Sequence, residues 1–496
     1  MPINLSWVVH NGKSLAAYLP ELVLLGTSLI CLLLGPFSSL SRKGPVLVGA
    51  AALTVFTVLS GALAGAPVQI LFSGAIALDP FAAFFKVFFG IVGLVTLAMV
   101  YRADEFKEVN LAEVTAFILA LVVSLSMMAA ADDILMMYLA LEMVSVLSYI
   151  MVGYKKHNRA SSEAGLKYIL YGAFSSGVMV FGLSYLFGLT GSTDLPSIAS
   201  HFAGLKGVSE APVLFFALLL IMTGFGYKIA TFPTQMWCPD VYEGAAVPIT
   251  AFLSVGPKAA GFAMTLRFLF TTFGLRDGSG VHIYEAINWQ LVLGLIAAVT
   301  MTFGNLAALP QRNLKRLMAY SSIGHAGYLL MGLSAQTAQG VQAVLFYLVT
   351  YLLMNFGVFL VILLVGNHLH TEELDGYRGL GWRTPFLAAS LTVFLFSLTG
   401  LPPFAGFVGK YFLFAAVIQQ GNYWLAALAA VNTVISLFYY ARIIRAIWLE
   451  TPLNPAHVAV SAGAVLFTTL LSAPTLLLGV YWTPLLRWTE HSLLGL

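Results

Sequence analysis

The sequence predicts an all-α membrane protein that crosses the bilayer about fourteen times. Of its 496 residues, 59% are hydrophobic and only 9% are charged. A soluble protein carries about a quarter charged residues, so most of this surface is expected to face lipid. Helical spans are expected because backbone groups in hydrocarbon must be hydrogen-bonded within their own segment. The net charge of +3 is too small to indicate nucleic-acid binding.

Long apolar stretches place the spans, because ~30 Å of hydrocarbon takes about 20 residues of helix. The seventh and twelfth spans are expected to be discontinuous, because prolines interrupt them. The predicted spans are 18–36, 44–64, 80–101, 112–130, 133–153, 163–190, 212–232, 247–273, 288–308, 316–334, 340–365, 385–410, 411–448 and 463–482.

Basic residues orient these spans, since short cytoplasmic loops are rich in Lys and Arg. Even-numbered loops hold few basic residues, so both termini are predicted on the non-cytoplasmic side. Residues 1–17 lack the compact apolar region and cleavage site of a signal peptide, so the first span is expected to direct insertion. The odd-numbered loops carry Arg42 and Lys43, Arg102 and Lys107, Lys155, Lys156 and Arg159, Arg312, Lys315 and Arg316, and Arg378 and Arg383.

Redox and nucleotide chemistry have no motif in this sequence. Cys31 and Cys238 show no CxxC or Cys/His spacing, which argues against an iron–sulfur or zinc site. Neither a GxGxxG motif after a strand nor a P-loop is present. The chain is therefore expected to hold no cofactor or metal of its own.

Glu142 lies in the middle of the fifth span, in ILMMYLALEMVSVLSYIMVG. A charge at bilayer depth costs about 2.5–3.5 kcal/mol, so such residues are rare and usually functional. Helical spacing places Tyr138, Ser145 and Tyr149 on the same face. We interpret Glu142 as a proton-carrying carboxylate. The alternative is a structural carboxyl neutralised by hydrogen bonds between helices.

Lys228 stands five residues before Pro233, near the end of the seventh span. Proline blocks a regular helix, and broken helices at membrane depth occur only inside protein or beside a wet cavity. The pattern therefore favours a proton relay at Lys228. Its alternative is a lysine whose amine reaches the membrane interface.

Two further lysines lie deep in the predicted spans. Lys258 is too far from either end of its span to reach an interface, which favours a functional role. Residues 385–421 are almost continuously apolar and would extend about 55 Å as one helix. Pro402 and Pro403 are therefore expected to interrupt that helix, with Lys410 close to the break.

Three other residues are weaker candidates. Lys167 has Glu163 four residues before it, so a place on the proton path and a surface ion pair both stay open. His325 is interpreted as a relay because histidine exchanges protons readily; its alternative is a hydrogen-bonded structural group. Arg267 is expected near an interface or in a structural pair.

The two predicted breaks suggest internal symmetry. Lys228 precedes its proline, whereas Lys410 follows Pro403 by seven residues. Interrupted spans at corresponding positions of two halves are typical of inverted repeats around a transport site. We therefore divide the chain into a three-helix segment at 1–111, a first five-helix repeat at 112–273, a second, inverted repeat at 288–448 and a last helix at 449–496.

Three stretches of the sequence are distinctive: GYKIATFPTQMWCPDVYEGAAVPITAFLSVGPKAAGF at 226–262, NLKRLMAYSSIGHAGY at 313–328 and SLTGLPPFAGFVGKYFLF at 397–414. They resemble the antiporter-like subunits of respiratory complex I, the NADH:quinone oxidoreductase, and most closely its N-subunit family. M subunits typically carry glutamate at the position of Lys410, and L subunits are longer, with a C-terminal lateral helix. Mrp antiporter subunits typically contain PDAYPAAPSPVSAL where this chain has PDVYEGAAVPITAF.

The resemblance implies fourteen helices, two inverted five-helix repeats with discontinuous seventh and twelfth helices, and a hydrated line of charged residues halfway across the bilayer. Glu142 and Lys228 are expected to form an ion pair whose separation changes the proton affinity of both groups. The family positions of the proton path, carried over motif by motif, fall on Glu142, Lys228, Lys258, Lys410, His325 and Lys167.

The expected function is proton translocation in the membrane arm of a complex I-type enzyme, driven by quinone reduction in other subunits. Quinone, NADH or ferredoxin, FMN and iron–sulfur clusters are expected in those subunits, and M-type and K-type subunits are the expected neighbours. The bacterial cytoplasmic membrane is expected rather than the thylakoid. The alternatives are an Mrp-type cation/proton antiporter subunit, a structural spacer and a solitary secondary transporter.

Overall fold

The computed structural model describes residues 12–35, 43–107, 109–203, 211–277, 280–283, 288–452 and 459–495. Within these ranges the chain is almost entirely helical, as predicted. Two short antiparallel hairpins join helices: β1 (Gln69–Leu71) pairs with β2 (Ile76–Leu78), and β3 (Gly274–Asp277) pairs with β4 (Gly280–Ile283).

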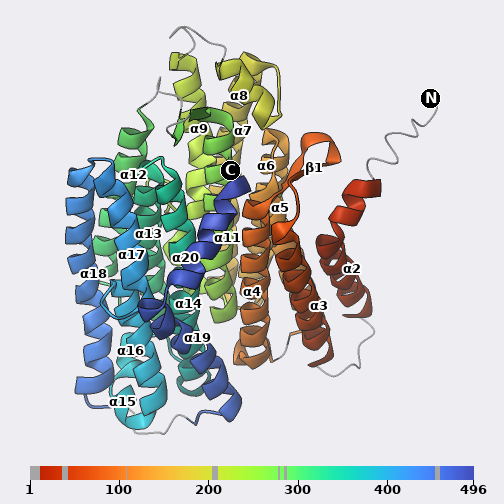
Figure 1. Cartoon of the computed structure of the whole chain (residues 1–496). Coiled ribbons are helices and arrows are strands. Elements are labelled where there is room, and N and C mark those ends of the chain that lie inside the picture. The colour runs from red at the N-terminus through yellow and green to blue at the C-terminus, as the bar shows by residue number, and fades with distance from the viewer. Residues whose placement is uncertain are drawn as a thin grey trace.

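The helices form one bundle, with the N-terminal helices at one end and α18 at the other (Figure 1). The first group is α2 (Leu19–Leu34), α3 (Lys43–Ala62) and α4 (Pro80–Arg102). The second is α5 (Leu111–Ala130), α6 (Ile134–Val152), α7 (Arg159–Thr190), α8 (Leu195–Ala203), α9 (Ala211–Ile229), α10 (Trp237–Gly244) and α11 (Val247–Phe273). The third is α12 (Trp289–Ala308), α13 (Leu314–Ser334), α14 (Ala338–Leu369), α15 (Leu380–Arg383), α16 (Pro385–Thr399), α17 (Ala405–Gln419) and α18 (Tyr423–Leu449), followed by α19 (Ala462–Val480) and α20 (Thr483–Ser492).

Side-chain caps fix where the important helices begin. Asp133 accepts hydrogen bonds from the N–H groups of Leu135 and Met136, at 2.8 and 3.0 Å, and so starts α6. Asn313 accepts from the N–H of Arg316, at 3.1 Å, and starts α13. Such caps satisfy N–H groups that have no partner within the helix. The faces that α6 and α13 present to the bundle are therefore set from their first turns.

Eleven helices in the described part of the chain are long and apolar enough to cross a membrane. Three shorter apolar helices, α2, α16 and α17, coincide with other predicted spans. Helix α13 matches the predicted span 316–334 but is not among the eleven, because Ser321, Ser322 and His325 lower its hydropathy. The count of fourteen crossings therefore stays a prediction.

Both predicted helix breaks are present. Helices α9 and α10 are separated by a non-helical stretch around Pro233, and α16 and α17 by one around Pro402 and Pro403. The peptide bonds Phe232–Pro233 and Pro402–Pro403 are cis. The discontinuous seventh and twelfth helices expected from the sequence are thereby confirmed.

The predicted boundary between the twelfth and thirteenth spans is wrong. Residues 411–419 continue α17, and the next helix starts only at Tyr423. The turn lies at Gly421, whose φ of 72° is a left-handed conformation that suits glycine. The apolar run continues past Lys410 without interruption, so the hydropathy pattern does not indicate where this turn lies.

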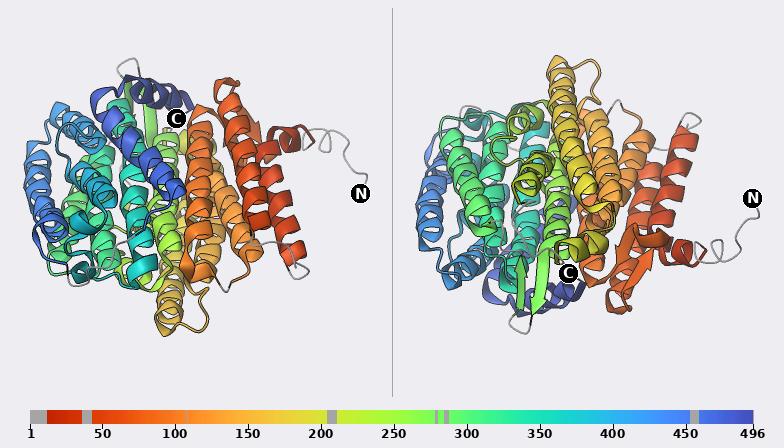
Figure 2. Two further views of the ribbon diagram at one scale, coloured as in Figure 1. Left: turned by 90° about the horizontal axis from the view of Figure 1, so that it is seen from below. Right: turned by 90° about the horizontal axis from the view of Figure 1, so that it is seen from above.

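Helix α11 is the centre of the bundle. Its most apolar 18-residue window is completely buried, and it packs against α4, α5, α9, α13 and α14. Figure 2 shows this green helix between the orange N-terminal helices and the cyan C-terminal ones. Any charged side chain on α11 is therefore surrounded by protein.

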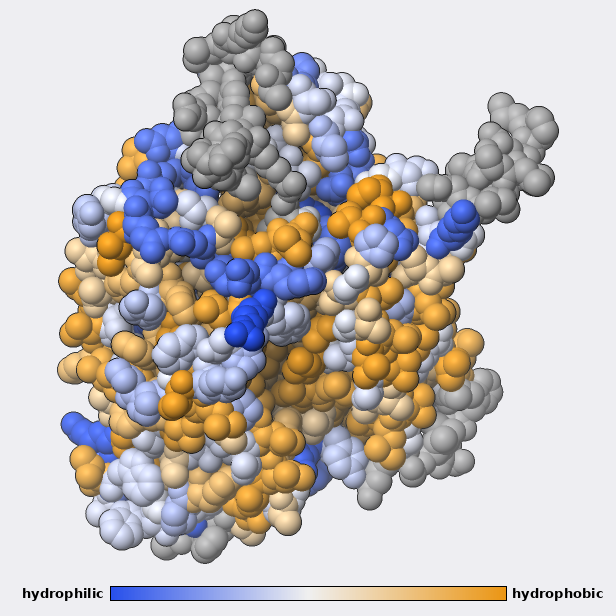
Figure 3. All heavy atoms as spheres, viewed as in Figure 1, coloured by the Kyte–Doolittle hydropathy of each residue, from blue (hydrophilic) through white to orange (hydrophobic). Residues whose placement is uncertain are grey.

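The outer helices present apolar side chains. Hydrophobic residues cover most of the face shown in Figure 3, and hydrophilic ones gather toward its upper end. Helix α7 lies on one side of the bundle and α20 on the opposite side (Figure 2). Only 33% of the apolar window of α7 and 22% of that of α19 are buried, as expected for helices that face lipid.

Close packing of α12 on α13 depends on Gly304, and Gly304→Ala is expected to lower stability by about 1–3 kcal/mol. A Cβ at this position would lie 2.4 Å from the backbone nitrogen of Gly324, which cannot move aside without shifting a helix. Gly294→Ala on the same helix is the control, because its nearest neighbour, Leu425 Cδ2, would be 3.5 Å away. The melting temperatures of the two purified variants should differ, and equal values would contradict the packing account.

Candidate functional site

Lys228 lies in the last turn of α9, immediately before the first helix break. Its side chain is buried, and its Nζ donates a hydrogen bond to Ser145 Oγ of α6 at 3.1 Å. An amine held in this way does not reach a membrane interface, so the structure disfavours that alternative. The neighbouring α11 passes close by: a Cβ at Gly261 would lie 3.5 Å from Cβ of Lys228.

Glu142 is half-buried on α6, one turn before Ser145. Both Glu142 and Lys228 belong to the described chain, and no ion pair joins them in this arrangement, so the expected pairing stays a prediction. The amine is directed to the Ser145 hydroxyl instead. Glu142 Oε1 is buried and has no hydrogen-bond partner among the residues that the structure describes. The carboxylate is thus close to the lysine but not bound to it.

Lys258 is buried at mid-length of α11. Its amine donates to Ser322 Oγ of α13 and lies 5.9 Å from the ring centre of Tyr242. The Tyr242 hydroxyl is in turn 3.4 Å from Ser322 Oγ. A hydroxyl and an aromatic ring are its close partners in the described chain, so the amine has no fixed counter-charge there.

A polar stripe leads from Lys258 to the N-terminal end of α11. Thr250, Ser254 and Lys258 follow at four-residue intervals, which places them on one helix face. Ser254 Oγ accepts a hydrogen bond from Asn355 of α14. Beside the start of α11 lies a cavity of about 730 Å³, lined by Glu105 among other acidic residues. Glu105 also accepts a hydrogen bond from the first N–H of α11, at 2.8 Å.

His325 lies on α13, one turn beyond Ser322, and is buried. Its Nδ1 is 2.6 Å from the Tyr347 hydroxyl and its Nε2 is 3.1 Å from the Tyr440 hydroxyl. Each ring nitrogen therefore has a tyrosine hydroxyl as its partner, and a hydroxyl can either donate or accept the hydrogen bond. This arrangement is compatible with the relay and with the structural alternative.

Lys410 lies in the second turn of α17, just after the second helix break. Its amine donates to the carbonyl of Thr399, the last residue of α16, at 2.9 Å. The same amine lies 4.4 Å from the ring centre of Tyr328 on α13. At Gly400, with φ of 88°, a Cβ would come within 2.8 Å of the lysine side chain, so glycine makes room for it.

Helix α13 connects two of the buried lysines. Ser322, His325 and Tyr328 follow at three-residue intervals along one side of this helix. Lys258 binds Ser322 at one end of this series, and Lys410 lies over Tyr328 at the other. Residues from α11, α13 and α17 thus form a buried series of polar and aromatic side chains, which we call the α13 ladder.

Lys167 lies apart from the α13 ladder, in a cluster of ion pairs. Its amine is 2.7 Å from Asp240 and 2.9 Å from Glu163, and its side chain is 38% exposed. Arg316 joins the same cluster through Asp240 and Glu243, each at 2.7 Å. The surface ion pair left open by the sequence is therefore present, although the contact with Asp240 of the discontinuous seventh helix was not foreseen.

Arg267, also on α11, is held in a structural pair as expected. Its guanidinium makes two hydrogen bonds to Asp79, at 2.8 and 3.0 Å, and a third to the Ala129 carbonyl at 2.9 Å. All three members are buried. Burial raises the pKa of Asp132, in the turn between α5 and α6, to about 6, although the charge of Arg267 opposes this shift.

Sequence reasoning missed a buried ion pair between Glu21 of α2 and Lys86 of α4. Their charged atoms are 2.7 Å apart, and their side chains are 0% and 2% exposed. Lys86 also lies 5.6 Å from the ring centre of Tyr18. The signal was present, because Lys86 interrupts the apolar run FFKVFF inside the predicted third span.

The model of one protein family, described as NADH:quinone oxidoreductase/Mrp antiporter, TM, matches residues 131–436. The chain belongs to this family. It is 44% identical to NADH-quinone oxidoreductase subunit N of Anaeromyxobacter sp. (strain Fw109-5) over 98% of each chain. It is 42% identical to NADH-quinone oxidoreductase subunit N 2 of Sorangium cellulosum (strain So ce56), again over 98% of each. The resemblance to the N-subunit family is thereby confirmed.

Two solved structures share the fold. A chain of respiratory complex I from Thermus thermophilus with bound Aureothin has a TM-score of 0.79 at 29% identity, and the match covers 94% of this chain and 98% of that chain. A chain of the Mrp complex from Dietzia sp. DQ12-45-1b has a TM-score of 0.83 at 19% identity, over 96% of each chain. At that identity the second match indicates the fold alone.

Lys86→Met is expected to destabilise the protein by about 3–5 kcal/mol, because it leaves the Glu21 carboxylate buried without its partner. Combining Lys86→Met with Glu21→Gln removes both charges and should restore most of this loss. Melting temperatures of the purified variants measure the effect. A double variant that is no more stable than Lys86→Met would show that the pair is not a coupled unit.

Proposed function

We propose that this chain translocates protons as a non-redox subunit of the membrane arm of a complex I-type NADH:quinone oxidoreductase. The observation that carries the proposal is the α13 ladder, which joins two buried lysines, one in the central helix and one at a helix break. The identity to N subunits over almost the whole chain supports the same function.

In this proposal Lys228, Lys258 and Lys410 hold protons in turn, and His325 bridges the last two. The Lys410 amine donates a hydrogen bond to the carbonyl of Thr399, the last residue of α16, and this bond positions it beside the α13 ladder. Lys258 has only polar uncharged contacts, which suits a group that gains and loses a proton. Glu142 changes the proton affinity of Lys228 when the two groups approach and separate.

Protons reach Lys258 from the acidic cavity at the start of α11. Four carboxylates line this cavity, three of them paired with lysines, and they offer groups that exchange protons with water. Ser254 with Asn355 continues the polar contacts inward. Lys167 belongs to a separate ion-pair cluster, and we assign it an influence on the discontinuous seventh helix through Asp240.

In this proposal the driving energy comes from quinone reduction in other subunits. Among the described residues no group of three or more His, Cys, Asp or Glu residues is placed to hold a metal. NADH or ferredoxin, FMN, iron–sulfur clusters and quinone belong to partner subunits, and M-type and K-type subunits lie beside this one. The two inverted repeats, 112–273 and 288–448, each supply one broken helix, between the segment 1–111 and the last helix 449–496.

The protein is proposed to reside in the bacterial cytoplasmic membrane with both termini on the non-cytoplasmic side. An Mrp-type antiporter subunit is not favoured, because the full-length matches at 44% and 42% identity are to N subunits. In the described chain Lys258 contacts Ser322 and Tyr242 and is not paired with a carboxylate, whereas Arg267 is paired with Asp79. This difference argues against a purely structural role for Lys258.

Lys258→Ala is expected to leave assembly intact and to lower proton transfer through this chain by about a hundredfold, because the relay loses a proton-carrying group. Protons pumped per electron, measured with the assembled enzyme in vesicles, should fall. Lys156→Ala is the control, since that lysine is exposed in the loop between α6 and α7 and lies outside the proposed path. Normal stoichiometry in Lys258→Ala would defeat the relay, and failure to assemble would favour the spacer.

Ser254→Ala is expected to slow proton uptake, because it removes the hydroxyl between Lys258 and the acidic cavity. Ser254→Thr keeps the hydroxyl and should retain pumping. The matched control is Ser126→Ala, a buried serine that bonds only the Val122 carbonyl of its own helix. Initial pumping rates in vesicles at several external pH values test this. A rate in Ser254→Ala equal to that of the control would exclude this route.

A further inference from the structure

The α13 ladder ends at an apolar layer just beyond Lys410. Helices α13, α14 and α17 all place a tyrosine or lysine side chain around this point, and each helix becomes apolar one turn farther on. The pairs, polar residue first, are Tyr328 and Gly332 on α13, Tyr347 and Val344 on α14, and Lys410 and Leu413 on α17. Val344 and Leu413 are completely buried. We call Gly332, Val344 and Leu413 the Leu413 seal.

Two glycines let the helices close tightly at the Leu413 seal. A Cβ at Gly332 would lie 2.4 Å from Cδ2 of Leu413 and 2.9 Å from Cγ2 of Val344, so glycine lets both side chains reach the backbone of α13. Gly340 lies one turn before Val344 on α14, and a Cβ there would be 2.5 Å from the carbonyl oxygen of Gly332. Helix α13 is therefore in direct contact with both α14 and α17 at this level.

Polar side chains return on the far side of the seal. Thr337 caps α14, and its Oγ1 accepts a hydrogen bond from the N–H of Gly340 at 3.1 Å. Gln336, in the turn before it, has a buried Nε2 with no hydrogen-bond partner among the residues that the structure describes. Buried amide groups are bonded to protein or to water, so water is expected at Gln336. Since Gly340 and Tyr347 are seven residues apart on one helix, the apolar layer is about 10 Å thick.

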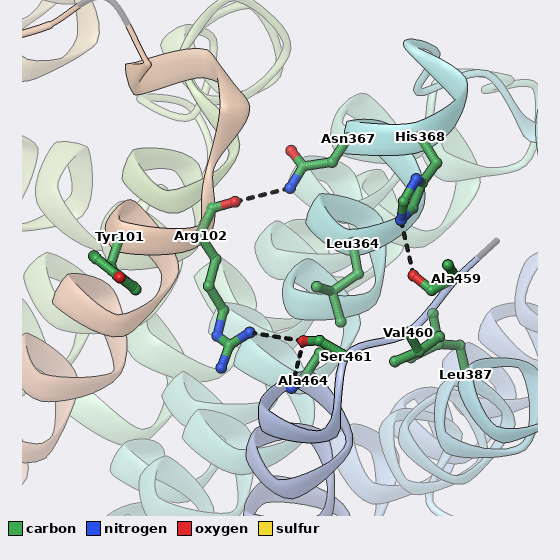
Figure 4. Close-up of a pocket in the computed structure, with 10 residues that line it drawn as sticks. All are labelled: Tyr101, Arg102, Leu364, Asn367, His368, Leu387, Ala459, Val460, Ser461 and Ala464. Carbon is green, nitrogen blue, oxygen red and sulfur yellow. Dashed lines mark hydrogen bonds between the residues drawn. The ribbon is translucent and has the colours of Figure 1, made fainter.

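The opposite ends of the same helices are open. Asn313, at the start of α13, and Asn367, near the end of α14, both line the acidic cavity of about 730 Å³. Asn367 also lines a second cavity, of about 510 Å³, where its amide donates to the Arg102 carbonyl at 2.8 Å (Figure 4). The Leu413 seal lies at the last turn of α13 and the first two turns of α14. The proposed path is thus open at the acidic cavity and closed at the seal.

We propose that Leu413 is the barrier at the release end of the proton path, an inference that rests on the function proposed above. Apolar constrictions stop conduction by excluding water, so with the seal closed Lys410 exchanges protons with the α13 ladder alone. When α17 moves away from α13, water connects Lys410 to Gln336. The proton on Lys410 Nζ then passes to that water and leaves a neutral amine. Because α17 begins at a helix break, it can shift as a short separate helix.

Passive proton leak tests the closed state in the assembled complex. The complex is reconstituted into vesicles that contain a pH-sensitive dye, and an external acid step is applied without an electron donor. Leu413→Ser should speed internal acidification about tenfold, because a hydroxyl beside Lys410 supplies the polar partners that water needs to enter. Leu413→Met keeps the side-chain volume and should stay tight. Leu425→Ser is the matched control, because Leu425 is a buried leucine between α12 and α18.

A double variant separates this inference from the proposed function. Adding Lys258→Ala to Leu413→Ser should abolish the leak, because protons reach the seal through the α13 ladder. A tight Leu413→Ser variant, or a leak that persists in the double variant, would overturn the role of Leu413. Normal pumping stoichiometry in Lys258→Ala alone contradicts the proposed function instead.

Cysteine labelling tests the opening, even if Leu413→Ser proves unstable. The assembled complex with Leu413→Cys is treated with a small charged thiol reagent on the side opposite the acidic cavity, and labelled peptides are identified by mass spectrometry. Labelling should be about tenfold faster during turnover than at rest, since an apolar constriction admits the reagent only when it is wet. Cys31 of α2 is buried and serves as the internal reference. The same labelling rate in both states would overturn the proposal.

Discussion

The structure depends on one constraint: an ammonium group buried among apolar helices must find its hydrogen-bond acceptors inside the protein. Regular helices offer few, because their carbonyl groups are already bonded. A helix break frees carbonyl groups at the end of its first half. Lys410 uses one of these, the carbonyl of Thr399, and so the break is the condition for a lysine at that depth. At Lys410 the helix break and the buried charge therefore belong to one local arrangement.

Helix α11 carries two buried charges, one fixed by an ion pair and one free to exchange a proton. Arg267 of α11 is saturated by two hydrogen bonds to Asp79 and one to a carbonyl, an arrangement that holds two elements together. Lys258, nine residues earlier on α11, contacts a serine hydroxyl and a tyrosine ring. Losing its proton leaves no carboxylate unpaired. This difference in partners, rather than burial, separates the structural charge from the proposed relay.

Composition and local motifs were enough to predict the helical class, both helix breaks and the unusual position of Lys258. These features follow from hydropathy, proline chemistry and the cost of a charge within a single span. The partners of the charges did not follow, because they lie far away in the sequence: Ser145 is 83 residues from Lys228, and Asp240 is 73 from Lys167. The Glu21–Lys86 pair joins two different helices, α2 and α4, so neither residue's local sequence identifies its partner.

The two broken helices also explain an asymmetry in the sequence. Lys228 stands before its proline and Lys410 after, yet both side chains lie near the end of a first half-helix. Lys228 is part of the last turn of α9, while Lys410 reaches back from α17 to the last carbonyl of α16. Both lysines are therefore connected with the C-terminal end of a half-helix, Lys228 by its place in the chain and Lys410 by its hydrogen bond. If the two halves are inverted repeats, Lys228 precedes its proline and Lys410 follows its own because the chain runs in opposite directions through the two breaks. Packing alone would not require a charge at either break, and the presence of a lysine at both is the feature that the proposed proton-carrying role accounts for.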